Sequence, residues 1–192
     1  AIPKTLMTSQ SQEMILILPG SFIMGTPRRS QGRLSNENER LVEITKPFYI
    51  GTKEVTNNEF RAFKPKHTSG AEMFRELSNG MHPTVMVSWS DAAAYCNWLS
   101  QQESLMPAYE NVDGQYKLKK PVTNGYRLPT EAEWEFVATG GGRRNFPWNA
   151  EGGPRCDRAV SFKNGAQCSA DTQEVGTHPA GQSPEGLSDL IG

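Results

Sequence analysis

The pattern of hydrophobic and polar positions predicts three short helices. Each begins where Thr or Ser precedes Glu or Asp by three residues, an arrangement in which side chains cap the first helical turn. The expected helices run over Val55–Phe63, from Trp89 to about Gln101, and from Thr130 to the Gly140–Gly142 run. On the second helix one apolar face should be buried, and it comprises Ala92, Tyr95, Cys96 and Leu99.

Runs of apolar residues and the placement of prolines predict short strands between these helices. Met14–Thr26 is interpreted as two strands around a Pro19–Gly20 turn. Leu41–Thr52 is interpreted as strand, bend and strand, with Pro47 at an edge position. An irregular α+β domain with small antiparallel sheets is therefore expected.

Three further segments show no helical or strand period. Residues 1–13 are polar and predict a loose N-terminal arm, and residues 102–124 predict an insertion loop with a turn at Asp113–Gly114. After Gly142 almost nothing is periodic, and so long an irregular stretch needs bound ions or disulfides to order it. These patterns predict one domain over residues 14–192, without an internal repeat.

Composition narrows the classes of function. The chain has 192 residues, enough for one buried core, and its 18 glycines and 13 prolines suit an irregular domain better than a helical bundle. The net charge of -1 comes without a basic stripe, which argues against a nucleic-acid partner. No apolar run approaches the roughly 20 residues of a membrane helix, so no transmembrane segment is expected.

The three cysteines form no C-x-x-C pair, which argues against a zinc knuckle or a thioredoxin motif. Cys156 and Cys168 flank a Gly-containing loop, and they either close a disulfide in an oxidising compartment or remain unrelated thiols. Cys96 lies on the predicted second helix and is expected to be a small buried apolar group.

The histidines do not form a metal-binding pattern. His67, His82 and His178 lie far apart, and none has a partner at the i+3 or i+4 spacing of a metal site. The sequence also lacks a G-x-S-x-G nucleophile elbow and a Walker phosphate loop. Hydrolase and nucleotide chemistry are therefore not indicated.

The carboxylates of the third predicted helix are better explained by helix stability than by acid–base catalysis. Glu131, Glu133 and Glu135 alternate at its start, where the helix dipole favours negative charge. The G-G-G-R-R run at residues 140–144 follows this helix, whereas phosphate-binding loops precede one. It is interpreted as a helix exit with a basic loop.

Seven motifs follow one another in the order found in one known family. R-L-P-T-E-A-E-W-E, at Arg127–Glu135, resembles the signature of the formylglycine-generating enzymes, also called sulfatase-modifying factors. The six other motifs that resemble segments of this family are Pro19–Gly25, Phe48–Phe63, His82–Ser100, Phe146–Asn149, Cys156–Val160 and Gly186–Gly192. The resemblance implies an irregular C-type-lectin-like α+β fold, low in regular structure, with about three short helices packed on small antiparallel strands.

The resemblance covers the N-terminal two thirds of the family domain, so the chain is expected to be truncated before the C-terminal third. In catalytic members that third carries two nearby cysteines, which bind copper(I) and activate oxygen. Cys96, Cys156 and Cys168 do not match those positions. No catalytic or cofactor-binding residue is carried over, and copper is expected only if a cysteine pair exists beyond Gly192.

The resemblance also implies a partial calcium site. Asp189 matches a position that supplies a side-chain ligand, and Gly192 matches one that offers its backbone carbonyl. Calcium takes about six to eight oxygen ligands, so the remaining ligands would lie elsewhere. The alternative is that Asp189 is a solvated turn residue. A second family site would use an Asn that Val160 replaces here.

Two functions follow from this pattern. The first is a non-catalytic domain that acts as a secreted or envelope-associated binding, structural or accessory module. The alternative is a formylglycine-generating oxidase whose catalytic part is absent from this chain, so enzyme activity stays open. A protein partner or self-association is expected to complete the domain. A disulfide between Cys156 and Cys168 and the start at Ala1 without Met favour a periplasmic, envelope or extracellular location over the cytoplasm.

Overall fold

The computed structural model describes residues 2–30, 32–148, 153–160, 162–163, 166–169 and 171–191. Its strands are β1 (Thr5–Met7), β2 (Glu13–Ile17), β3 (Gly20–Met24), β4 (Arg40–Ile44), β5 (Phe48–Gly51), β6 (Tyr109–Val112), β7 (Gln115–Leu118), β8 (Phe162–Lys163) and β9 (Ala166–Gln167). Its helices are α1 (Asn57–Phe63), α2 (Trp89–Gln102) and α3 (Glu131–Ala138), with short 3-10 turns η1 (Arg75–Ser78) and η2 (Pro179–Gly181). The predicted irregular α+β class, with three short helices and small antiparallel sheets, is confirmed.

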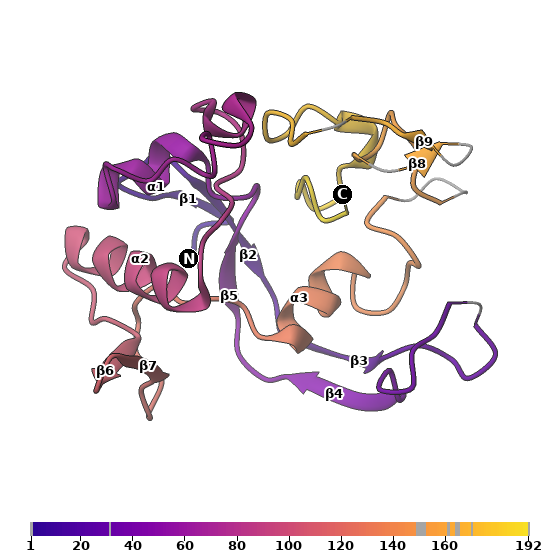
Figure 1. Cartoon of the computed structure of the whole chain (residues 1–192). Coiled ribbons are helices and arrows are strands. Elements are labelled where there is room, and N and C mark those ends of the chain that lie inside the picture. The colour runs from indigo at the N-terminus through magenta and orange to yellow at the C-terminus, as the bar shows by residue number, and fades with distance from the viewer. Residues whose placement is uncertain are drawn as a thin grey trace.

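The sheets are small and wholly antiparallel among the residues described. Strands β1, β2 and β5 form one sheet, in which Ile15 lies opposite Thr5 on one side and Ile50 on the other. Strands β3 and β4 form a separate pair. The Pro19–Gly20 step therefore leads the chain from one sheet into another and does not close a hairpin. Figure 1 shows α1 and α2 on one side of the three-stranded sheet and α3 on the other.

The N-terminal segment differs from the expected loose arm, because Thr5–Met7 forms the edge strand β1. It pairs with β2, and the Leu16 N–H donates to Lys4 O at 2.8 Å just beyond the strand. The Tyr49 hydroxyl also donates to Pro3 O at 2.6 Å. Backbone hydrogen bonds hold this segment, and a short edge strand with two exposed residues has too little apolar alternation to be recognised from sequence.

The segment over residues 102–124 also differs from the expected insertion loop, because it contains the β6–β7 hairpin. The turn predicted at Asp113–Gly114 is confirmed, with positive φ at both residues, 52° and 81°. Such a pair closes a two-residue hairpin turn of the kind that matches strand twist. The flanking strands were missed because most of their side chains are exposed, with only Tyr109 buried.

Three apolar clusters stabilise the domain. The first cluster comprises Ile17, Val137 and Leu187, and it joins the three-stranded sheet, α3 and the C-terminal run over residues 171–191. Phe60, Tyr95 and Leu99 join α1 to α2, and the third cluster comprises Ala93, Ala108 and Tyr109. Tyr95 and Leu99 are buried on α2 as predicted, whereas Ala92 and Cys96 are half-buried and Ala93 and Ser100 are fully buried.

Helix α3 is fixed at its start by a capping box that is tied to an arginine. The Thr130 hydroxyl accepts from Glu133 N–H at 3.2 Å, and the Glu133 carboxylate accepts from Thr130 N–H at 2.8 Å. Arg127 donates both terminal nitrogens to the same carboxylate, at 2.7 and 2.5 Å. Burial alone would raise the pKa of Glu133, but the hydrogen bonds and charge of Arg127 and the Thr130 N–H outweigh it and hold the pKa below its ordinary value.

We predict that Glu133→Ala lowers the free energy of unfolding by about 2–4 kcal/mol, because it removes a helix cap and leaves the Arg127 charge half-buried without its partner. The matched control is Glu131→Ala, whose side chain is 84% exposed and lies 3.8 Å from Arg40. That change should cost less than about 1 kcal/mol.

Urea unfolding monitored by tryptophan fluorescence measures the free energy of unfolding of both variants. The stability that the Glu133 carboxylate contributes should be present above the ordinary pKa of glutamate and be lost as the pH falls below it, since the folded pKa is the lower one. Equal losses for the two variants at neutral pH would contradict this role of Glu133.

Candidate functional site

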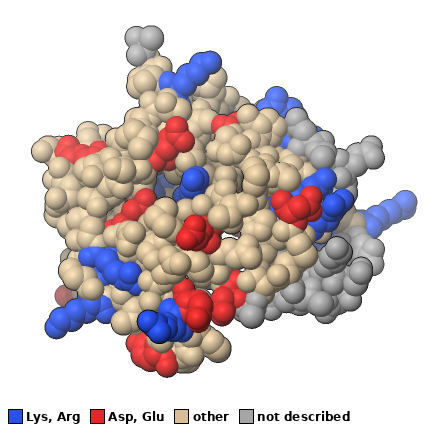
Figure 2. All heavy atoms as spheres, turned by 90° about the horizontal axis from the view of Figure 1, so that it is seen from above, with Lys and Arg blue, Asp and Glu red and all other residues tan. Residues whose placement is uncertain are grey.

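A pocket of about 440 Å³ lies where three segments meet. These are the turn between β5 and α1, the stretch from Leu77 to Val85, and the C-terminal run from Asp171 to Ile191. The C-terminal run lies at the top of Figure 1. Figure 2 shows the molecule from that side, with Asp and Glu side chains around hollows near the centre of the face and a Lys or Arg among them.

Backbone hydrogen bonds join the first two segments. The Thr84 N–H donates to Val55 O at 2.8 Å, and an isolated antiparallel bridge pairs Thr56 with Pro83. Because these contacts extend from the N-cap of α1, the position of Glu54 relative to Pro83 is set by the backbone and not by flexible side chains.

The C-terminal run is attached to the same framework. The Val175 N–H donates to Met81 O at 3.1 Å, and the Ser188 N–H donates to Thr52 O at 2.8 Å. Leu187, beside Ser188, is 1% exposed and packs into the sheet–α3 cluster. An irregular segment is thus held by backbone bonds and by the packing of Leu187 and Leu190.

Asp189 lies near the end of this C-terminal run, two residues before Ile191. Its φ of 57° places the backbone in the left-handed region, which Asp tolerates better than most residues. Its carboxylate Oδ2 accepts from Gly176 N–H at 2.6 Å, so it closes the loop between residues 176 and 189. The carboxylate therefore has a structural partner and also lines the pocket.

Glu54 lines the same pocket as Asp189, although the residue as a whole is exposed. Desolvation of its carboxyl, together with the negative charge of Asp189, raises the pKa of Glu54 to about 7. The pocket therefore presents carboxylates that repel one another when both are ionised.

The calcium site expected at Asp189 and Gly192 stays a prediction. Asp189 Oδ2 accepts a hydrogen bond from Gly176 N–H, and Gly192 lies outside the described residues. The described residues contain no group of three or more His, Cys, Asp or Glu side chains arranged to hold a metal ion, and the remaining ligands of the about six to eight that calcium takes would lie elsewhere.

The three histidines lie in separate surroundings. His178 lines the pocket, and the Nδ1 atom of His82 lies 3.0 Å from the Thr172 hydroxyl on the C-terminal run. The Nε2 atom of His67 lies 2.9 Å from Val85 O. His82 and His67 thus contact the frame of the pocket, which is compatible with a structural role.

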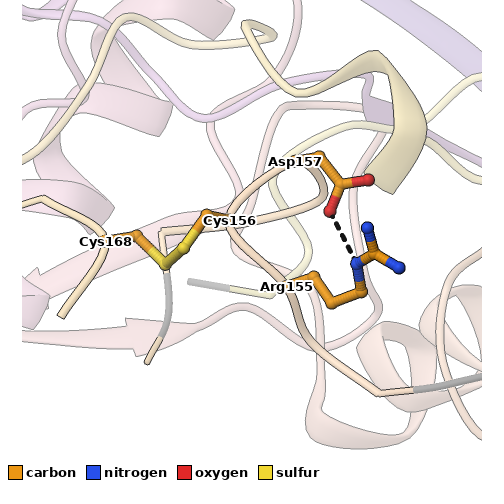
Figure 3. The surroundings of a disulfide bond; sticks show 4 residues. All are labelled: Arg155, Cys156, Asp157 and Cys168. Atoms are coloured by element: carbon orange, nitrogen blue, oxygen red, sulfur yellow. Dashed lines mark hydrogen bonds and ion pairs between the residues drawn. A yellow bond between two sulfur atoms is a disulfide. The ribbon is translucent and has the colours of Figure 1, made fainter. Parts of the chain in front are cut away.

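The cysteines resolve the alternatives that the sequence left open. Cys156 and Cys168 form a disulfide, with Cα atoms 5.5 Å apart. Figure 3 shows this bond beside an ion pair between Arg155 and Asp157, whose atoms lie 3.0 Å apart. Cys96 is free, and burial raises the pKa of its thiol to about 12.

The carboxylates of α3 and the basic loop after it serve structure. Glu135 accepts from Gly25 N–H at 2.7 Å and so ties α3 to β3. Arg144 donates to both carboxylate oxygens of Glu185, at 3.0 and 2.8 Å, and so ties the loop after α3 to the C-terminal run. The structural interpretation of these charges is supported by both contacts.

Sequence reasoning did not identify Glu54 or Asp171 as site residues. Both line the pocket with Asp189, yet they come from distant parts of the chain and share no local motif. The one available signal was the position of Glu54 in the turn after β5, two residues before the Thr56 cap of α1. Loops held by regular elements often carry functional side chains.

The chain belongs to the sulfatase-modifying factor family, since the model of the Sulfatase-modifying factor enzyme 1-like domain matches residues 2–192. The chain is similar to two curated relatives. The Chaperone protein LppX of Paenibacillus barcinonensis is 32% identical over 162 residues, which cover 77% of this chain and 52% of the relative. The Inactive C-alpha-formylglycine-generating enzyme 2 of Mus musculus is 28% identical over 237 residues, covering 96% of this chain and 67% of the relative.

Solved structures share the fold. Treponema denticola variable protein 1 superposes with a TM-score of 0.77 at 25% identity, over 98% of this chain and 73% of that one. PvdO from Pseudomonas aeruginosa superposes with a TM-score of 0.70 at 23% identity, over 99% of this chain and 72% of that one. The chain thus spans about half the length of LppX and roughly seven tenths of these solved chains.

We predict that the stability of the protein falls as the pH rises from 4.5 to about 7, in part because the folded Glu54 carboxyl holds its proton more tightly than the unfolded one. Glu54→Gln should remove this part of the pH dependence, so the variant gains stability relative to wild type at pH 8 and not at pH 4. Solvent contact at Glu54 keeps the effect small.

Urea unfolding at several pH values measures the difference between variant and wild type. Glu43→Gln, at an exposed position on β4, is the matched control and should leave the profile unchanged. Parallel pH profiles of the free energy of unfolding for wild type and Glu54→Gln would show that the pKa of Glu54 is not raised.

Proposed function

We propose that this domain is a non-catalytic sulfatase-modifying-factor module that binds or assists another protein outside the cytoplasm. The state of the cysteines within residues 1–192 carries this proposal, which concerns this domain and not any further part of a longer protein. Catalytic members that the sequence resembles use a pair of thiols to bind copper(I). In this chain two of the three cysteines are bonded to each other, and the third is a half-buried, poorly acidic thiol on α2.

The residues of this chain therefore do not fit copper(I). A thiol binds a soft metal as its thiolate, and a pKa of about 12 keeps Cys96 protonated at neutral pH. Cys96 also has no second free cysteine beside it, since the other two form the disulfide. No oxidation step is assigned to this chain.

Two relatives support a role without formylglycine formation. One is described as an inactive formylglycine-generating enzyme and another as a chaperone. Both descriptions apply to those proteins, and they are compatible with a family fold that also serves functions other than formylglycine formation. Fold alone does not decide function, so the cysteine chemistry remains the main support.

A location outside the cytoplasm is supported by the Cys156–Cys168 bond, since such bonds persist in oxidising compartments. None of the described helices is long and apolar enough to cross a membrane. A periplasmic, envelope-associated or extracellular position is therefore favoured over the cytoplasm.

A protein partner or a second copy is supported by apolar side chains left on the surface. Ile23 and Leu41 lie opposite each other on β3 and β4 and are 53% and 72% exposed. Neighbouring exposed apolar side chains of this kind mark interaction surfaces when they form a contiguous patch. A copy of this chain or another polypeptide is the partner that they favour.

The alternative is an oxidase whose catalytic part lies elsewhere in a longer protein. Several formylglycine-generating enzymes match this chain, among them that of Mus musculus, at 32% identity over 123 residues. That match covers 60% of this chain and 26% of the enzyme. In this case the present domain would supply scaffold, and the thiol pair would come from the remainder.

We predict that thiol labelling finds no reactive cysteine in the native protein. Iodoacetamide should leave the native chain unmodified, modify only Cys96 after unfolding, and modify all three cysteines after unfolding and reduction. Intact-mass spectrometry counts the added groups.

The activity test incubates the protein with copper(I), oxygen and a cysteine-containing sulfatase peptide, beside a full-length formylglycine-generating enzyme as positive control. We expect no conversion of the peptide cysteine to formylglycine. Copper-dependent conversion, with two thiols labelled in the native chain, would replace the proposed function with the oxidase.

A further inference from the structure

We infer that a groove at the base of the β6–β7 hairpin is a binding site for an Asp or Glu side chain that a partner polypeptide presents. The groove has a volume of about 640 Å³ and lies between Met106 and Glu110 on one side and residues 119–124 on the other. Figure 1 shows the hairpin below α2 and away from the C-terminal run, so this groove is separate from the pocket described above. The inference deepens the proposed binding function and rests on it.

Two lysines give the groove its charge. Lys119 and Lys120 line it, and among the described residues their ammonium groups form no ion pair. Glu110 is the one acidic residue of the described lining, and it lies opposite Lys117 in the register of the hairpin, where opposite charges attract each other. The basic charge that remains is complementary to an anionic ligand.

A side-chain amide adds hydrogen-bond donors beside the lysines. The Asn124 Oδ1 atom accepts from the Met106 N–H at 3.1 Å, and only the oxygen end of an amide can accept such a bond. This bond fixes which end of the amide is the nitrogen, and its two N–H donors have no acceptor among the residues described. Ammonium and amide donors around one hollow match the two oxygens of a carboxylate.

Backbone contacts fix the two sides of the groove relative to each other. The Lys119 N–H donates to Ala108 O at 2.9 Å, and the Thr123 hydroxyl donates to Met106 O at 2.9 Å. Gly125 lies so close to the same Met106 carbonyl that a Cβ would collide with it. The groove is therefore formed before a ligand arrives, which lowers the entropic cost of binding.

The walls favour a carboxylate that belongs to a polypeptide. Met106 and Val122 are 61% and 57% exposed and line the groove with Pro121, so apolar side chains beside the acidic residue of the ligand can pack there. Glu110 can accept a hydrogen bond from a backbone N–H of the ligand, and it repels a doubly charged phosphate more than a single carboxylate. An acidic residue with apolar neighbours therefore fits best.

The test is NMR titration of the isotope-labelled protein with the blocked tripeptide acetyl-Leu-Glu-Leu-amide, with acetyl-Leu-Gln-Leu-amide as the uncharged control. The glutamate peptide should bind at least about tenfold more tightly than the glutamine peptide and should shift the amide signals of residues 119–124. Lys119→Gln and Lys120→Gln should each weaken binding of the glutamate peptide about three- to fivefold, as expected for exposed charge pairs.

Asn124→Asp is the most specific variant. The new carboxylate keeps an acceptor for the Met106 N–H and places a negative charge where the amide donors were. Binding of the glutamate peptide should fall at least about tenfold. Lys66→Gln, at an exposed position outside the groove, is the matched control and should bind as wild type does. Circular dichroism should show that all variants are folded.

Equal affinity for the two peptides overturns the assignment, and so does the absence of binding at millimolar glutamate peptide. Inorganic phosphate that binds in the groove more tightly than the glutamate peptide, and that the lysine variants weaken, also overturns it in favour of a phosphate site. None of these results bears on the thiol labelling or the copper assay, so failure here leaves the non-catalytic function standing.

Discussion

The attachment of the C-terminal run to the end of the three-stranded sheet is the constraint on which the rest of this structure depends. The run has little regular secondary structure, and yet the Ser188–Thr52 and Val175–Met81 backbone bonds place it beside the first helix. Leu187, which is 1% exposed, packs between the sheet and α3, and Leu190 packs against the same cluster. Without these contacts the carboxylates of the pocket would belong to unrelated loops, and the domain would lack a defined pocket on this side.

The elements that local chemistry determines were predictable from the sequence. All three helices start where the Thr or Ser caps indicate, and the Asp113–Gly114 turn has the backbone conformation that its residues favour. The edge strand β1 and the β6–β7 hairpin were not predicted, because partner strands and not their own side chains stabilise them. Asp189 was expected from a family motif, whereas its neighbours Glu54 and Asp171 meet it only through tertiary contacts that no local pattern encodes.

The charges of this domain divide into two kinds. The Arg127–Glu133 and Arg144–Glu185 pairs satisfy each other and fasten α3 and its exit loop. The carboxylates of the pocket, by contrast, have no Lys or Arg beside them among the described lining residues, where His178 is the one basic side chain. The ion pairs fasten the framework, whereas like charges that gather in one hollow repel one another and oppose folding.

The Cys156–Cys168 bond has a consequence for how the protein must be produced. It closes a loop with a sequence separation of 12, and closing a loop of that size removes about 3 kcal/mol of chain entropy from the unfolded ensemble. Ala159 and Val160, which line the pocket, lie inside that loop. A chain synthesised in a reducing cytosol would therefore lose about this much folding free energy, even if its helices formed normally. Oxidative folding is accordingly part of how this domain acquires its stability.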